Sequence, residues 1–181
     1  MNEGFATLYE NVLNDIVFPE KNQWESFLID FYDIAIFLDS TLFIPGLNDY
    51  VESPDDIRAK FDFATYFKGA ILLRMFKEVL TEETFVKGVR NFLLDRQFDS
   101  GSPEQLYTAL QRAYDEDFPG NDLDITDKMG PWFDLPGFPV LTVSRSDQGV
   151  TLTQEAFRIT RDDVFPIPIN YATKSNPDFD N

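Results

Sequence analysis

The side chains that could do chemistry in this sequence are carboxylates and tyrosines, because histidine and cysteine are both absent. Without histidine, the chain alone supplies no Ser-His-Asp triad, no histidine general base and no histidine ligand to a metal. Disulfides and thiolate chemistry are excluded in the same way. The 32 acidic residues and 7 tyrosines that remain are too many to define a site by residue type alone.

One acidic segment, "DEDFPGNDLDIT", has part of the spacing of a calcium-binding loop. Asp115, Asp117 and Gly120 occupy the first, third and sixth positions of such a loop. Pro119 breaks the pattern, and Thr126 stands where the loop needs a glutamate that binds calcium with both oxygens. We therefore interpret this segment as a solvated turn and not as a metal site.

Composition and charge indicate a folded domain with an acidic surface. Hydrophobic residues make up 43% of the 181 residues, which is enough to build a core. The formal net charge of −17 argues against nucleic-acid partners and against docking on an anionic membrane surface. No apolar stretch reaches the roughly 18 residues of a membrane span, and the first residues lack the basic cluster of a signal peptide.

The first two-thirds of the sequence predicts helices, because apolar residues recur at helical spacing. Ser53, Thr81 and Ser102 are expected to cap helices, with Pro54 and Pro103 at first helical positions. One helix is predicted near 3–15, with Phe5, Leu8, Tyr9, Val12 and Ile16 on one face. Another is predicted over 24–39, with Phe27, Leu28, Phe31, Ile34, Ala35 and Leu38 on a single stripe. Residues 61–80 are apolar nearly all round and predict a buried helix, and a last short helix is expected near 125–133.

The pattern changes to strands after residue 135. Alternation over 140–144 and a turn over 146–149 predict a β-hairpin. Residues 164–173, "VFPIPINYAT", predict a third strand whose prolines suit an edge. Helices followed by strands define an α+β chain.

Five segments, in this order, resemble the aminopeptidase N family of zinc metallopeptidases, the gluzincins. They are "NEGFA", "ATYFKGAILLRM", "LTEETFVKGVRNFL", "MGPWFDLPGFPVLTV" and "FPIPINYATKSNPDF", the last being most similar to the insect members. The resemblance implies that residues 1–134 are the mostly helical C-terminal part of a thermolysin-like catalytic domain. It implies that 135–181 are the first strands of a β-sandwich domain, which is incomplete here.

The resemblance also implies two site residues. Glu3, the glutamate of "NEGFA", corresponds to the third zinc ligand, and Tyr66 corresponds to the tyrosine that donates to the oxyanion. On residue type alone, Glu3 would be an exposed acid and Tyr66 a core tyrosine. Packing or helix-surface roles are expected for Lys68, Gly69 and Arg74, and a structural role at the domain junction for Trp132 and the 136–139 turn.

Two motifs of the family are missing from this sequence: the zinc-binding H-E-x-x-H helix and the amine-binding G-x-M-E-N segment. The resemblance therefore implies an internal fragment that begins at the third zinc ligand and is inactive alone. The complete enzyme would hold one zinc ion, cleave N-terminal residues from peptides and lie on the extracellular face of the plasma membrane. The alternative is a non-catalytic binding or scaffold protein on a degenerate peptidase fold.

Overall fold

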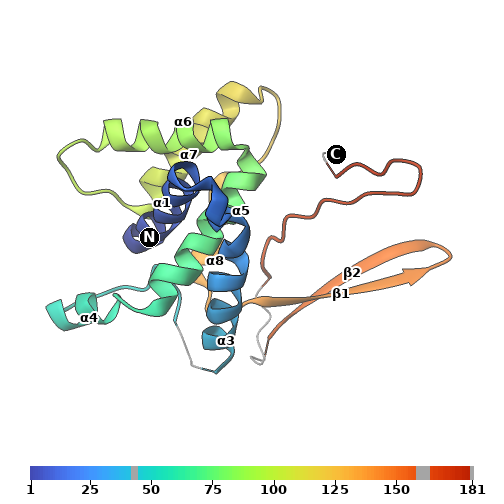
Figure 1. Cartoon of the computed structure of the whole chain (residues 1–181), viewed down its shortest axis with the longest axis horizontal. Coiled ribbons are helices and arrows are strands. Elements are labelled where there is room, and N and C mark those ends of the chain that lie inside the picture. Colours follow the sequence, from blue (N-terminus) through green and yellow to red (C-terminus); the bar gives the residue numbers. More distant parts are fainter. Residues whose placement is uncertain (42–44, 158–163, 180–181) are drawn as a thin grey trace.

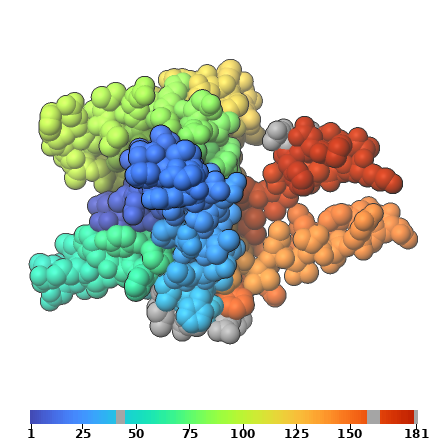
Figure 2. Space-filling model, in the orientation of Figure 1, coloured from blue at the N-terminus to red at the C-terminus, as the bar shows by residue number. Residues whose placement is uncertain are grey.

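The computed structural model describes residues 1–41, 45–157 and 164–179. Helices pack into one body, from which a two-stranded hairpin and the C-terminal segment project on one side (Figures 1 and 2). The α+β class predicted from the sequence is confirmed. The elements are α1 (Asn2–Val17), η1 (Pro19–Lys21), α2 (Gln23–Phe27), η2 (Leu28–Tyr32), α3 (Asp33–Thr41), α4 (Pro54–Ala59), η3 (Ala64–Lys68), α5 (Gly69–Leu80), α6 (Glu82–Asp95), α7 (Pro103–Asp117), α8 (Ile125–Asp134), β1 (Pro139–Ser146) and β2 (Gly149–Ala156).

The helix starts follow the capping signals in the sequence. Ser53 and Ser102 each accept a hydrogen bond from a backbone N–H three residues on, and each closes a capping box. The Thr81 side chain caps α6 by accepting from the Thr84 backbone N–H. These three predictions are confirmed because a cap depends only on residues within one turn of chain.

Helix α5 is the central element of the core. It contacts α1, α6, α8 and the two π-helical turns, η2 and η3. Buried side chains on it include Leu72, Leu73, Phe76 and Leu80. Among the helices of the described ranges, none combines the length and the apolar character needed to cross a bilayer.

Helix α1 buries a face that is rotated from the one predicted: Leu8 is buried as predicted and Phe5 and Val12 pack partly buried against the core, but the fully buried stripe includes other residues. Its buried residues are Gly4, Thr7, Leu8 and Asn11, which follow helical spacing, whereas Ile16 is 69% exposed. Gly4 determines this orientation because it packs against Gly69, at the start of α5. A Cβ atom built on Gly4 would lie 2.8 Å from the carbonyl carbon of Gly69, so two backbones touch at this crossing.

The prediction of one regular helix over 24–39, with a single buried stripe, is also wrong. The π-helical turn η2 interrupts it between α2 and α3. A π turn inserts an extra residue and rotates the following face, so residues spaced for one stripe separate. Phe27 and Ala35 are buried, while Leu28 and Ile34 are 46% and 44% exposed.

Strands β1 and β2 form the predicted hairpin, with Val143 opposite Leu152 and Ser146 opposite Gly149. The third predicted strand does not form, because residues 164–173 carry no strand pairing. Pro166 and Pro168 have no backbone N–H to give to a ladder. Instead, the Gln154 side chain exchanges two hydrogen bonds with the Phe165 backbone, at 2.8 and 2.9 Å.

Replacing Gly4 by alanine should destabilise the fold, because the added methyl group would meet backbone atoms of Gly69 and Ala70 at 2.8 to 3.1 Å. We expect the free energy of unfolding to fall by about 1–3 kcal/mol, the usual cost of overpacking. Gly130→Ala in α8 is the matched control, since its nearest such contact is Asp134 Oδ2 at 3.6 Å. The free energy of unfolding of that variant should not fall, and it should rise by up to ~1 kcal/mol because alanine has a higher helix propensity than glycine. Chemical denaturation of both variants measures the difference, and equal effects would contradict the close packing.

Candidate active site

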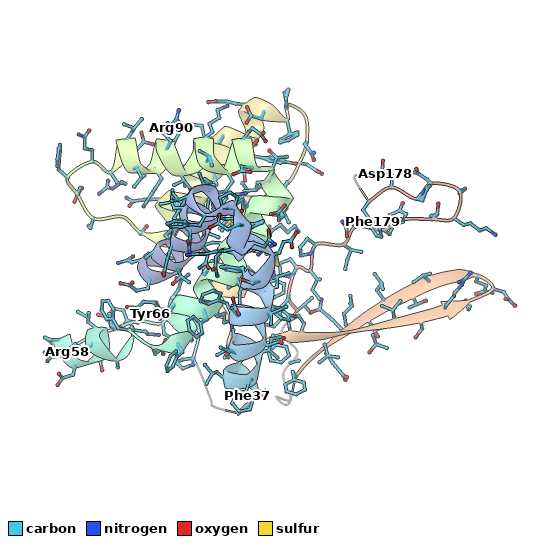
Figure 3. All side chains as sticks on the ribbon, viewed as in Figure 1. Phe37, Arg58, Tyr66, Arg90, Asp178 and Phe179 are labelled. Atoms are coloured by element: carbon cyan, nitrogen blue, oxygen red, sulfur yellow. The ribbon has the colours of Figure 1, made fainter. Side chains whose placement is uncertain are left out.

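Glu3 and Tyr66, which lie far apart in the sequence, interact in the structure. Glu3 is in the first turn of α1, and Tyr66 is in η3, which packs against α1 (Figure 3). Both side chains are half-buried. Burial raises the pKa of Tyr66 above its ordinary value, and the negative charge of Glu3 and hydrogen bonding to it raise this pKa further. Like any tyrosine, Tyr66 carries its proton at neutral pH, and its phenol is therefore available as a donor.

The first anchor of the turn that carries Tyr66 is an aromatic contact. Phe67 packs edge-to-face on Phe31 of η2, with ring centroids 5.1 Å apart. Phe31 in turn packs on buried Phe27, with ring centroids 4.9 Å apart. An edge-to-face pair favours one orientation of the two rings, so this contact limits rotation of η3.

The second anchor is the ammonium group of Lys68. It donates to Asp39 Oδ2 on α3 and to the backbone carbonyl of Gly137, each at 2.8 Å. Lys68 is buried, so both bonds form away from water. Of the packing and helix-surface roles expected for Lys68, the structure shows a packing role, because the buried side chain joins three separate parts of the fold.

The third anchor is Gly69, whose expected packing role is confirmed by its contact with Gly4 of α1. Gly4 follows Glu3 directly in the sequence, and Gly69 comes three residues after Tyr66. The backbone contact between the two glycines therefore brings α1 and η3 close enough for Glu3 and Tyr66 to interact. A side chain at either glycine would separate the two site residues.

The remaining predicted residues have structural contacts. Arg74 donates to the Trp24 carbonyl at 2.8 Å and lies 3.8 Å from the centre of the Trp24 ring. Trp132 donates to the carbonyl of Pro166 at 3.0 Å, which ties α8 to the segment after the hairpin. The expected structural roles of Arg74 and Trp132 are confirmed.

The residue that sequence reasoning missed is Asp39. Its side chain is 5% exposed and pairs with Lys68. The signal was present, since a lone aspartate follows the apolar run "IAIFL" and a buried carboxylate needs a partner. The sequence could not identify that partner, which lies 29 residues away.

Comparison with known proteins identifies the family of the chain. Residues 1–132 match the Peptidase family M1 domain. The chain belongs to peptidase family M1. Among its relatives, membrane alanyl aminopeptidase of Manduca sexta is 35% identical over all of this chain and 19% of its own length. Alanine/arginine aminopeptidase of Saccharomyces cerevisiae is 33% identical, over all of this chain and 21% of its own. Leucyl aminopeptidase of Saccharolobus solfataricus is 30% identical over 88% of this chain and 19% of its own length.

The chain thus spans about a fifth of the length of these family M1 relatives. The match to the M1 domain ends at residue 132, and helix α8 ends at Asp134. The division into a catalytic part over 1–134 and a sandwich part over 135–181 stays a prediction. The expected resemblance to the aminopeptidase N family is confirmed, since all three of these relatives are named aminopeptidases.

The acids of this M1 chain do not gather into a complete metal site within the described ranges. No group of three or more His, Cys, Asp or Glu residues there could hold an ion. Asp117, from the segment with calcium-loop spacing, accepts a hydrogen bond from the Thr84 hydroxyl at 2.8 Å and another from the Lys87 ammonium at 2.7 Å. Glu3 is thus at most one ligand of a larger set.

Removing the charge of Glu3 should lower the pKa of Tyr66. In Glu3→Gln, the electrostatic part of the shift disappears while the effect of burial remains. We therefore expect a pKa between that of the unmodified chain and the ordinary tyrosine value. Tyrosine-selective NMR over an alkaline pH series measures it, with Tyr66→Phe used to assign the signal. Glu10→Gln, an exposed acid on the same helix, is the matched control, and an equal shift in both variants would contradict the interaction.

Proposed function

We propose that this chain forms part of a zinc-dependent aminopeptidase, in which Glu3 binds the metal and Tyr66 stabilises the oxyanion. The observation that carries the proposal is the interaction between the half-buried carboxylate of Glu3 and the Tyr66 phenol. Membership of peptidase family M1 and the names of the relatives, which are aminopeptidases, support the same reaction class. The substrates would be peptides with a free N-terminus.

Glu3 suits the role of a single metal ligand. A carboxylate is a common zinc ligand, and catalytic zinc sites use three protein ligands with one open position. When bound in such a site, zinc activates water and polarises the scissile carbonyl. The other ligands are not supplied by the described residues of this chain, so Glu3 would complete a set formed with other residues.

Tyr66 would act through its protonated hydroxyl. The negative charge that develops on a peptide carbonyl oxygen is best stabilised by a donor already oriented toward it. Tyr66 Oη carries its proton at neutral pH, as tyrosines ordinarily do. Phe67, Lys68 and Gly69 hold the turn that presents it. Such a donor needs little reorganisation during the reaction, which is the source of its effect on rate.

An extracellular position at the plasma membrane stays a prediction from the family resemblance. Two insect relatives, from Manduca sexta and Heliothis virescens, are named membrane alanyl aminopeptidases. By analogy with those two proteins, we propose that the complete enzyme is associated with a membrane.

A chimaeric enzyme tests the two site residues directly. Residues 1–181 would replace the matching segment of the Manduca sexta enzyme, and hydrolysis of alanine p-nitroanilide would be measured together with zinc content. We expect Tyr66→Phe to retain zinc and to lose on the order of 10²-fold in kcat, the usual effect of removing one oxyanion donor. Glu3→Gln should lose zinc and activity together.

Two conservative changes at exposed positions are the controls for the chimaera. Tyr50→Phe and Glu10→Gln make the same chemical changes away from the site and should leave both zinc and kcat unchanged. Full activity of the Tyr66→Phe chimaera would overturn the role of Tyr66. A folded chimaera that binds zinc but is inactive before any substitution would favour the non-catalytic binding or scaffold role.

The isolated chain should hold zinc weakly. One carboxylate competes poorly with water, and tight catalytic sites depend on chelation by several ligands. After dialysis against buffer without metal, we expect much less than one zinc per chain, with no difference between the unmodified protein and Glu3→Gln. Elemental analysis measures this, and tightly held stoichiometric zinc would show that the chain contains a further ligand set.

A further inference from the structure

We propose that Lys68 is a positioning residue for Tyr66, and that it fixes this oxyanion donor against the turn at Gly137, which precedes β1. The inference rests on the function proposed above for Tyr66. It goes further because Gly137 lies beyond residue 132, where the match to the Peptidase family M1 domain ends. A turn outside the matched domain thus helps to set the rate.

The Lys68 side chain connects the turn that carries Tyr66 to two other parts of the fold. Its ammonium nitrogen donates to Asp39 Oδ2 on α3 and to the carbonyl oxygen of Gly137, each at 2.8 Å. Lys68 is only 7% exposed, so water does not readily replace either bond. Lys68 and Tyr66 belong to the same five-residue turn, η3, so a displacement of one backbone displaces the other.

Hydrogen bonds hold the Lys68 side chain, because the packing around it is incomplete. Lys68, Asp39 and Gly137 all line a cavity of about 240 Å³, whose other walls come mostly from α3, α5, α8 and the start of β1 (Figure 1). A side chain beside open space can adopt other rotamers unless polar contacts select one of them. The two bonds from the ammonium group therefore determine where Lys68 lies, and with it η3.

The Lys68–Asp39 pair is poorly suited to a purely stabilising role. Asp39 Oδ1 is buried and has no hydrogen-bond partner among the described residues, so the desolvation of the carboxylate is only partly compensated. Apolar residues of similar size often replace a buried ion pair with no loss of stability. A stabilising role and a positioning role therefore predict different results when both charges are removed together.

The double variant Asp39→Leu with Lys68→Met separates these two roles in the full chain. Its free energy of unfolding should stay close to that of the unmodified chain, because no unpaired charge remains. The bond to Gly137 is lost, however, so η3 should shift and the Tyr66 hydroxyl should move away from Glu3. We expect the carbon NMR signal of Tyr66 Cζ at neutral pH to move in the same direction as it does in Glu3→Gln. Tyr66→Phe identifies the signal.

The matched control is the double variant Lys77→Met with Glu82→Leu. It removes another pair with a buried lysine, whose ammonium nitrogen lies 3.2 Å from Glu82 Oε2. Neither residue belongs to η3, since Lys77 is on α5 and Glu82 begins α6. The Tyr66 signal should therefore keep its position in this variant.

The chimaera with the Manduca sexta enzyme gives the kinetic readout. The double variant Asp39→Leu with Lys68→Met should lose about 10- to 10²-fold in kcat, because a small misplacement of a reacting group is enough for such a loss. KM and zinc content should stay unchanged. Gly137→Ala should act in the same way, since Gly137 has a φ of 75° and alanine would strain the turn and displace its carbonyl. Gly120→Ala brings a similar strain at a φ of 89° in an exposed turn, and should leave kcat unchanged.

Two results would overturn the positioning role. One is a folded double variant at Asp39 and Lys68 in which the Tyr66 signal or kcat is unchanged. The other is a fall in kcat together with a loss of zinc or a rise in KM, which general disruption of the fold would produce. If the double variant does not fold, the comparison of Gly137→Ala with Gly120→Ala decides by the same measurements. A chimaera that is inactive before any substitution contradicts the proposed function, and the NMR comparison then decides alone whether Lys68 positions Tyr66.

Discussion

The contact between the backbones of Gly4 and Gly69 is the constraint on which the candidate site depends. With no Cβ on either residue, α1 approaches the start of α5 so closely that a methyl group on Gly4 would overlap the other backbone. Glu3 and Tyr66 are placed by this approach, because each is within three residues of one glycine. The crossing also turns Thr7 and Asn11 toward the interior, although neither would be chosen for a core by its polarity. Asn11 meets this cost by donating to the Thr7 carbonyl at 2.8 Å.

The turn that carries Tyr66 is held by its next three residues, each on a different neighbour. Phe67 packs on η2, Lys68 binds α3 and the Gly137 carbonyl, and Gly69 contacts α1. A π-helical turn is rare in a helix, so it persists only where surrounding contacts stabilise it. In η3 those contacts come from the residues that follow Tyr66 and leave its hydroxyl available to Glu3. The residues that hold the turn, Phe67 to Gly69, are thus different from Tyr66, the residue that donates.

Local signals predicted local structure well, and long-range contacts account for what was missed. The caps at Ser53, Thr81 and Ser102 and the 139–156 hairpin depend on neighbours in sequence, and all were predicted. The buried face of α1 and the two π turns depend on packing between distant elements, which apolar spacing does not encode. The third strand does not form, since Pro166 and Pro168 cannot donate to a ladder and the Phe165 backbone bonds to the Gln154 side chain instead. Glu3 and Tyr66 could be selected only through family resemblance, since their interaction joins residues 63 positions apart.

The Lys68–Asp39 pair links the candidate site to the start of the strands. A buried ion pair adds little net stability compared with an apolar substitute, but losing one partner costs about 3–5 kcal/mol. Its value is therefore in geometry, and here Lys68 also binds the Gly137 carbonyl, at the turn before β1. Because Lys68 is two residues from Tyr66, a shift of that turn must be absorbed within η3 or break one of two buried hydrogen bonds. The position of Tyr66 is consequently coupled to the start of the hairpin, through a side chain that does not itself interact with Glu3.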